Sequence, residues 1–254
     1  MKILLRKNNM NFKNTIVIAS FSLTSASIVF GHGPAVDQVR PGVINGNALE
    51  IFKRDSGSGP HYKNSIWTTP LLDIAGSWDN EYPGFTPVKD ALPPGVSAIA
   101  PGTALGINLI APLKRWDGSE FNLLPLGETE EFRAYRTTAP TGTTVTSDSG
   151  FSAGFNFLTV DATLGQHRHI RYGLLGDGVN PTGGDDGLYL LTLEVTATGL
   201  LNSPPVYIIF NKNVDPVTQS AAEAWLAASL VPEPAAATLL VLGSIAMLRR
   251  RRLG

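Results

Sequence analysis

The chain has 254 residues, 43% of them hydrophobic, with no cysteine and a formal net charge of −1 at pH 7. The absence of cysteine excludes disulfide bonds and thiol chemistry, so stability has to come from burial, hydrogen bonds or metal. Eight of the 20 basic residues lie in the first 31 and the last 24 residues, whereas segment 32–230 has twelve basic and twenty acidic residues. The resulting charge of −8 on that segment disfavours nucleic acid or an anionic membrane as its partner.

Residues 1–31 have the pattern of a secretory signal peptide. An apolar stretch, Ile16–Phe30, ends in small residues and follows four basic ones: Lys2, Arg6, Lys7 and Lys13. Basic residues before a short apolar segment are typical of chains sent to the secretion machinery. A cut after Gly31 would make His32 the first residue of the mature chain, while cuts after Ala26 or Ser27 remain open.

Segment 32–230 has the length of one domain, and its pattern predicts an all-β fold. Residues 33–105 are rich in Gly, Pro, Asp and Asn, so loops and short edge strands are expected there around one clear strand, Ala48–Arg54. Strand-sized runs then follow at regular spacing: Gly106–Pro112, Leu113–Trp116, Glu130–Thr138, Thr143–Thr146, Phe151–Val160, Gln166–Leu175, Leu188–Thr198 and Val206–Asn211. This spacing favours a single β-sandwich or jelly roll.

Two elements at the end of this segment are strongly patterned. In Leu188–Thr198, Tyr189 and every second residue after it as far as Val195 share one face, which predicts a core-facing side. A closing helix is expected with Asp215 as its N-cap and Pro216 at its first position. Helical spacing in this segment places Trp225 against the sheet.

Residues 231–254 do not have the pattern of a folded core. Pro232, Glu233 and Pro234 precede an apolar run, Ala235–Leu248, and a basic cluster: Arg249, Arg250, Arg251 and Arg252. The prolines favour an extended, accessible segment, and the positive-inside rule places the arginines in the cytoplasm after a membrane helix. The three parts in this order resemble the PEP-CTERM sorting signal of Gram-negative bacteria. The resemblance implies removal by an exosortase, a precursor anchored transiently in the inner membrane, and a product at the cell surface, in the extracellular matrix or outside the cell.

The segment between the two signals is similar to an exported group of PEP-CTERM proteins. The shared motifs correspond to His32-Gly33, Pro83-Gly84-Phe85, Leu92–Gly95, Trp116–Phe121, His167–His169, Leu188–Val195 and Ile209–Asn211. The similarity implies an exported β domain and no particular activity. The expected function is therefore a structural or binding role in the cell envelope, without catalysis.

A metal-binding module is the first alternative. His167 and His169 are two apart on the predicted strand Gln166–Leu175, so their imidazoles should share a face, and His32 and His61 are the only other histidines. Zinc or copper suits such a set, although Arg168 and Arg171 oppose a cation and hydrogen-bonded surface histidines remain the simpler interpretation. Calcium is the second metal considered, since loop 176–187 contains four oxygen ligands: Asp177, Asn180, Asp185 and Asp186. Their spacing does not match the EF-hand loop, so a solvated turn between two strands is the favoured interpretation.

An enzyme is the most remote alternative, because the sequence has no H-E-x-x-H or P-loop motif. An N-terminal His32 could bind copper through its amino group and imidazole, with His61, His167 or His169 as the third nitrogen ligand. That arrangement resembles the histidine brace of lytic polysaccharide monooxygenases.

Two further clusters have two interpretations each. The acidic cluster Glu128, Glu130 and Glu131 is either a carboxylate pair or a solvated strand edge. The aromatic residues Trp67, Trp78, Tyr82 and Trp116 either line a face for extracellular polysaccharide or belong to the core.

Overall fold

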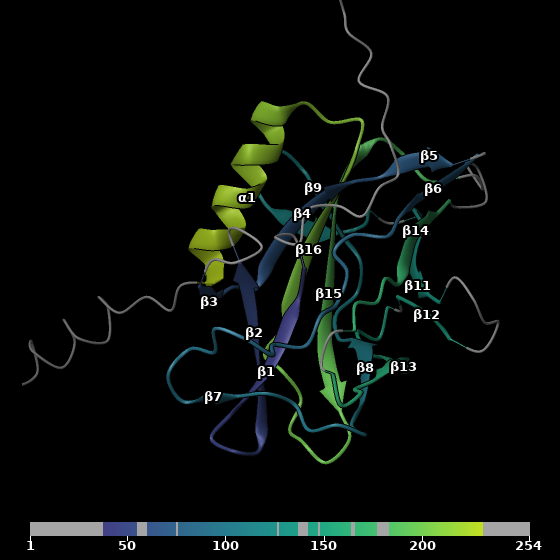
Figure 1. Cartoon of the computed structure of the whole chain (residues 1–254). Helices are drawn as coiled ribbons and strands as arrows, with labels where there is room; N and C mark the ends of the chain where they lie inside the picture. Colours follow the sequence, from purple (N-terminus) through teal and green to yellow (C-terminus); the bar gives the residue numbers. More distant parts are fainter. Residues whose placement is uncertain are drawn as a thin grey trace, which may run out of the picture. The chain divides into compact units, whose positions relative to one another are not determined.

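Three β-sheets and one α-helix make up the described part of the chain, as Figure 1 shows. The structure, a computed structural model, describes residues 38–54, 60–74, 76–125, 127–136, 142–146, 148–163, 166–176 and 183–230. The predicted all-β class is confirmed for these residues. The predicted signal peptide (1–31), His32 and the predicted sorting signal (231–254) lie outside them.

The first sheet is built from the N-terminal part of the described chain. It has four antiparallel strands in the order β3 (His61–Lys63), β2 (Ala48–Arg54), β1 (Arg40–Ile44) and β7 (Val96–Ser97). A tight turn joins β1 to β2, in which Asn45 and Gly46 have φ angles of 50° and 73°. Asn and Gly are the residues that tolerate this left-handed conformation best, so the sequence fixes the turn locally.

The second sheet has seven strands and is organised around β15 (Gly187–Ala197). One edge of β15 pairs with β16 (Val206–Lys212), which pairs in parallel with β4 (Ile66–Pro70). The other edge is shared by β9 (Lys114–Trp116), which continues to β10 (Phe121–Leu123), and β8 (Ala104–Leu109), which continues to β13 (Ser152–Thr159). In the bulged β13, a Cβ on Gly154 would lie 1.7 Å from the Ile107 carbonyl oxygen, so only glycine fits there.

The third sheet is antiparallel. Its order is β12 (Thr143–Val145), β11 (Glu131–Tyr135), β14 (Arg171–Leu175), β6 (Ser77–Asn80) and β5 (Leu72–Ile74). The hydroxyl of Tyr135 on β11 donates to Oδ1 of buried Asp79 on β6 at 3.0 Å. This hydrogen bond crosses the intervening strand, β14, and joins the two strands that flank it, β11 and β6.

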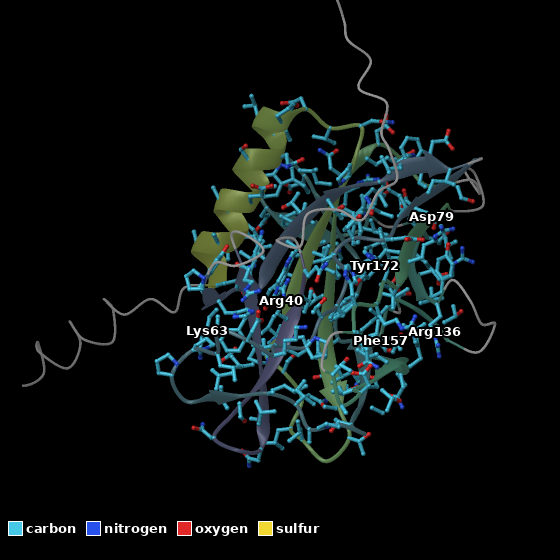
Figure 2. The ribbon with its side chains drawn as sticks, in the orientation of Figure 1. Arg40, Lys63, Asp79, Arg136, Phe157 and Tyr172 are labelled. Carbon is cyan, nitrogen blue, oxygen red and sulfur yellow. The ribbon has the colours of Figure 1, made fainter. Side chains whose placement is uncertain are left out.

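One hydrophobic core joins side chains of all three sheets. The alternating face of β15 that includes Tyr189 and Val195 is buried in it, as predicted. The Phe210 ring of β16 packs against Phe132 and Tyr172 of the third sheet, with ring centroids 4.4 and 5.2 Å apart. Figure 2 shows Tyr172 in the interior of the ribbon. These contacts hold the second and third sheets together.

The helix α1 (Pro216–Leu230) begins where the sequence predicts. Oδ1 of Asp215 accepts hydrogen bonds from the backbone amides of Val217 and Thr218 at 2.9 and 3.0 Å. Two of the amides that lack helical acceptors are satisfied in this way, and Pro216 has no amide hydrogen to satisfy. The hydrogen bonds from Thr218 lower the pKa of Asp215.

The same helix covers the face of β15 that points away from the shared core. Leu226 of α1 is buried with Leu188 and Leu190 of β15 in a second apolar cluster. Trp225 packs against Trp116 with ring centroids 5.9 Å apart, as expected for a residue facing the sheet. Burial of one leucine contributes about 1.5–3 kcal/mol, so this face adds to the stability of the fold.

Two sequence predictions are wrong in detail. The described residues of region 33–105 form seven complete strands, and two that were not predicted, β1 and β6, lie inside their sheets rather than at an edge. The predicted strand Gln166–Leu175 begins only at Arg171, because Arg168 forms a single bridge with Phe85 that does not continue as a ladder. The strands β6 and β14 pair with each other although they lie far apart in sequence, so no local pattern marks where either one begins. Within the described ranges no helix is long and apolar enough to cross a membrane.

Candidate functional site

The residues predicted to act in sorting lie outside the described part of the chain: Pro232, Glu233, Pro234 and Arg249–Arg252. The same is true of His32, so the predictions of cleavage, anchoring and an N-terminal copper ligand stay predictions. His61, His167 and His169 are described, as are all three residues of the predicted acidic cluster.

His167 and His169 lie side by side, with ring centroids 4.4 Å apart and ring planes inclined by 35°. The expectation that the two imidazoles meet is confirmed, although they precede β14 rather than lie within it. A Cβ on buried Gly84 would lie 3.0 Å from atoms of both rings, so the absence of a side chain there leaves room for the pair. Tyr82 packs edge-on to His169 at 5.2 Å.

Neighbouring protein groups bind the polar atoms of this histidine pair. Nδ1 of His169 lies 2.8 Å from the carbonyl oxygen of Glu81 and therefore donates to it. Buried Gln38 places its amide nitrogen 3.0 Å from Nδ1 of His167. Arg171, whose charge was expected to oppose a metal, is paired with the carboxylate of Glu81 at 2.9 Å.

His61 has a separate environment. It starts β3, is buried, packs edge-on to Phe52 at 6.5 Å, and has Nδ1 3.1 Å from the carbonyl oxygen of Ala91. Burial lowers the pKa of His61 because it disfavours the charged imidazolium. Across the described ranges, no three His, Asp or Glu side chains are placed to share a metal ion.

The acidic loop considered for calcium is described only in part, because Asp177 and Asn180 lie outside the described residues. Asp185 lies 3.6 Å from Arg115, and Asp186 lies 3.6 Å from Lys212. Each of these two carboxylates therefore faces a protein cation.

The four aromatic residues do not form one sugar-binding face. Trp67 is buried in the shared core, whereas Trp116 packs in the second apolar cluster under α1. Trp78 lies beneath the ammonium of Lys212, 4.7 Å from the ring centre, and Tyr82 contacts His169. The core interpretation is confirmed for Trp67.

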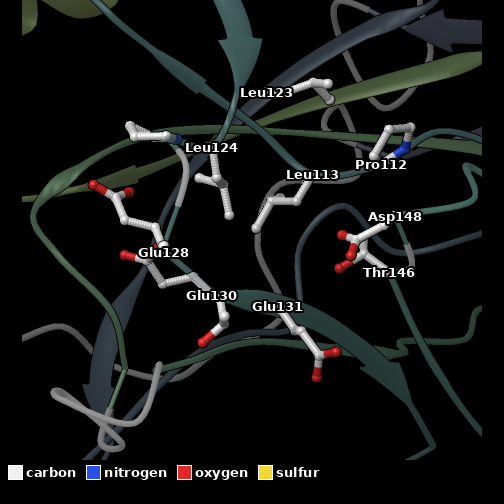
Figure 3. Close-up of a pocket in the computed structure, with 12 residues that line it drawn as sticks. Pro112, Leu113, Leu123, Leu124, Glu128, Glu130, Glu131, Thr146 and Asp148 are labelled. Atoms are coloured by element: carbon white, nitrogen blue, oxygen red, sulfur yellow. The ribbon is translucent and has the colours of Figure 1, made fainter.

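The sequence did not predict the cleft that the structure shows at the acidic cluster, which has a volume of about 430 Å³. We call it the carboxylate cleft and define it by its apolar side chains, Pro112, Leu113, Leu123 and Leu124, and its acidic ones, Glu128, Glu130, Glu131 and Asp148. Figure 3 shows Glu128 and Glu130 on one side of Leu113 and Leu124, and Asp148 on the other. Four carboxylates thus surround an apolar surface.

Local structure accounts for the shape of the cleft. A turn closed by a 3.0 Å hydrogen bond from the Glu128 amide to the Pro125 carbonyl, with Gly127 at φ 99°, leads from β10 toward β11. Thr146 exchanges two 2.9 Å hydrogen bonds with the backbone of Phe132, which holds the segment before Asp148 against β11. The two acidic walls therefore lie on the segment that precedes β11 and on the segment that follows β12.

Glu130 is the buried member of the acidic cluster, with a side chain only 2% exposed. Its Oε1 accepts from the Asp185 amide at 3.2 Å and lies 3.5 Å from Nη1 of Arg115 and from the Tyr189 hydroxyl. The solvated-edge interpretation is therefore wrong for Glu130, whereas Glu131 is exposed as that interpretation expects.

Arg115 is the cation nearest to the cleft, and Glu128 and Glu130 share it. Its Nη2 donates to Oε1 of Glu128 at 2.8 Å while Nη1 lies near Glu130. Burial opposes the charged guanidinium, but hydrogen bonding with Tyr189 and the charge of Glu128 raise the pKa of Arg115. The second oxygens, Oε2, of Glu128 and Glu130 are buried and have no hydrogen-bond partner among the described residues.

Comparisons with protein families, with curated proteins and with solved structures find no match to this chain. The geometry alone therefore defines the candidate site. Sequence reasoning found three of the four carboxylates but missed Asp148 and the leucines, because they come together only through the pairing of β9 with β10 and, in another sheet, of β11 with β12. The run of acidic residues beside two leucines and a proline, Leu123–Pro125, was the signal available.

Proposed function

We propose that this chain is an exported protein whose folded domain serves as a binding or structural component at the cell surface or in the extracellular matrix. Residues 1–31 direct it to the secretion machinery, and residues 231–254 hold the precursor in the inner membrane until an exosortase cuts near Pro232-Glu233-Pro234. We further propose that the three sheets form a β-sandwich. Extracellular polysaccharide is the proposed environment of the released domain.

One observation supports this proposal above the others. The last described element, α1, runs to Leu230, so the Pro-Glu-Pro motif follows in sequence after a single residue. A cut at this motif would separate the apolar run and the arginines from a domain whose three sheets share one core. The charge of −8 on segment 32–230 suits a solvated module outside the cell.

The test is to express the full chain in a host with and without its exosortase and to follow the C-terminal peptide by mass spectrometry. We expect Arg249–Arg252 to be lost only when the exosortase is present. A matched pair of variants sharpens the test: Pro232→Ala/Pro234→Ala should block processing, whereas Pro204→Ala/Pro205→Ala, in the segment before β16, should not. Retention of the arginines in both hosts contradicts the proposal.

Metal binding is the second candidate function, supported by the adjacent rings of His167 and His169. The hydrogen bond from Nδ1 of His169 to the Glu81 carbonyl leaves Nε2 as the nitrogen that could bind zinc or copper. His32 would have to supply a further ligand. Equilibrium dialysis with zinc, copper and calcium tests this function, and binding that survives in the His167→Ala/His169→Ala variant contradicts these ligands.

The copper enzyme stays the remote alternative and depends on the first mature residue. N-terminal sequencing of the exported protein decides it, because a chain that starts anywhere other than His32 cannot form a histidine brace with that residue.

A further inference from the structure

We propose that the carboxylate cleft binds an organic cation, specifically an aliphatic ammonium compound whose charged end lies among the carboxylates and whose hydrocarbon part covers the leucines. This inference goes beyond the proposed function and does not depend on export or sorting. It rests on charge, on the unsatisfied buried oxygens and on the apolar surface.

The charge balance of the cleft is negative. Its lining contains Glu128, Glu130, Glu131 and Asp148 and no basic side chain. The nearest cation, Arg115, is divided between Glu128, Glu130 and Asp185 at 2.8, 3.5 and 3.6 Å. One guanidinium cannot neutralise four carboxylates, so the cleft keeps a net negative charge among the described side chains. That charge attracts a cation that enters the cleft.

Glu130 provides a second, independent indication of a ligand. A carboxylate this well buried normally has every oxygen hydrogen-bonded, because an unpaired buried oxygen has lost its contact with water and gained nothing in exchange. Oε1 of Glu130 has its partners, but Oε2 is buried without one among the described residues, and so is Oε2 of Glu128. Both residues line the cleft, so an ammonium bound there offsets the charge of these oxygens.

The apolar lining favours an organic cation over a metal ion. Leu123 is 60% exposed at the cleft although it is a leucine, and Leu113 and Leu124 lie between the acidic walls. A metal needs oxygens converging at about 2.3–2.6 Å, as calcium does. No three acidic side chains of the described chain are placed to do so. A volume of about 430 Å³ lies within the range typical of small-molecule sites.

The experiment is isothermal titration calorimetry of the purified full-length protein with cadaverine, using n-pentanol and calcium chloride as comparison ligands. We expect saturable binding of cadaverine, none of n-pentanol at equal concentration, and weaker cadaverine binding as ionic strength rises from about 0.01 to 0.15 M. Because the readout is direct binding, its failure is distinct from a failure of sorting.

Variants of exposed residues locate the site without disturbing the buried network. Glu131→Gln/Asp148→Asn should raise the Kd for cadaverine about fivefold or more, and Leu123→Ser about threefold, because each loses one part of the contact. The matched controls Glu223→Gln and Val217→Ser, both on α1, should leave the Kd unchanged.

Three results would overturn the inference. These are the absence of saturable cadaverine binding, an unchanged Kd in Glu131→Gln/Asp148→Asn, and n-pentanol or calcium binding as tightly as cadaverine. Circular dichroism of each variant shows that the fold is retained, so a loss of affinity reports on the cleft itself.

Discussion

The histidine pair and the carboxylate cleft are both clusters of ionisable side chains on the third sheet or beside it, yet they differ in how the protein satisfies them. Around His167 and His169, the donor of Gln38 and the carbonyl of Glu81 lie within 3.0 Å of ring nitrogens. In the cleft, Glu128 and Glu130 share Arg115, and each keeps one buried oxygen without a partner among the described residues.

A cluster of reactive residue types is therefore a weak guide to function until its hydrogen bonds are counted. A cluster satisfied by its own fold is explained by stability alone, whereas buried polar atoms left over are a cost that a ligand can offset. The most conspicuous motif of the sequence, His167–His169, is therefore a weaker candidate for binding than a plain acidic run.

The largest expected effect is the loss of the buried carboxylate in the cleft. Glu130→Ala should lower the free energy of unfolding by about 2–3 kcal/mol, because Arg115 and the Asp185 amide lose an acceptor in a buried setting. Glu131→Ala, one residue away and exposed, should change it by less than about 0.5 kcal/mol. Urea denaturation of both variants measures the difference. Equal effects would mean that Glu130 is not held as the structure places it.

Sequence patterns predicted what depends on local chemistry. The alternation in Leu188–Thr198 identified β15 and its buried face, and Asp215-Pro216 identified the start of α1. These succeeded because strand alternation and helix capping involve residues within a few positions of one another.

What the sequence could not predict depends on distant partners. β1 reads Arg-Pro-Gly-Val-Ile, a composition that argues against a strand, and it forms because β2 and β7 pair with it on either side. β4 pairs in parallel with β16, which lies about 140 residues later in sequence. Glu130 is buried because Arg115 and Tyr189 arrive from β9 and β15, so no local pattern could separate it from Glu131.

The next largest effect is expected from a substitution beside the histidine pair. Gln38→Ala should lower the free energy of unfolding by about 1–2 kcal/mol, since buried Gln38 contacts His167 and accepts a hydrogen bond from the Thr86 hydroxyl. Gln166→Ala is the matched control: its amide also makes two hydrogen bonds, to Thr159 and Asp161, but lies nearer solvent, so the cost should be smaller. Thermal denaturation compares them, and a larger effect for Gln166 would reverse the ranking.

Two buried tyrosines allow a smaller comparison: Tyr189, which contacts Glu130 of the carboxylate cleft, and Tyr172, on the strand that follows the histidine pair. The hydroxyl of Tyr189 donates to the Asp185 carbonyl at 2.8 Å, whereas that of Tyr172 lies 3.4 Å from the Pro83 carbonyl. Removing the shorter bond should cost more, so Tyr189→Phe is expected to lose about 1 kcal/mol and Tyr172→Phe about half as much. Guanidinium denaturation at neutral pH measures both. The two variants remove the same atom, so an equal loss would show that distance does not decide the difference.

The smallest effect concerns His61, which contacts Phe52 and the Ala91 carbonyl rather than another of the described histidines, and so isolates the effect of burial from that of pairing. Burial lowers its pKa below the ordinary value of about 6.5, so the unfolded chain binds more protons than the folded one between the two pKa values. The stability contributed by neutral His61 is therefore complete above about pH 7 and is lost as the pH falls through about 6.5 toward the lower folded pKa.

His61→Gln should remove this part of the pH dependence, because glutamine can donate to the Ala91 carbonyl as His61 does and does not titrate. We expect the variant to be less stable than the original at pH 7 and to lose less stability between about pH 7 and 5.5. Chemical denaturation across this range measures the slope. Asp and Glu side chains titrate mainly below that window, so a slope that is unchanged in His61→Gln would mean that His61 does not carry this pH dependence.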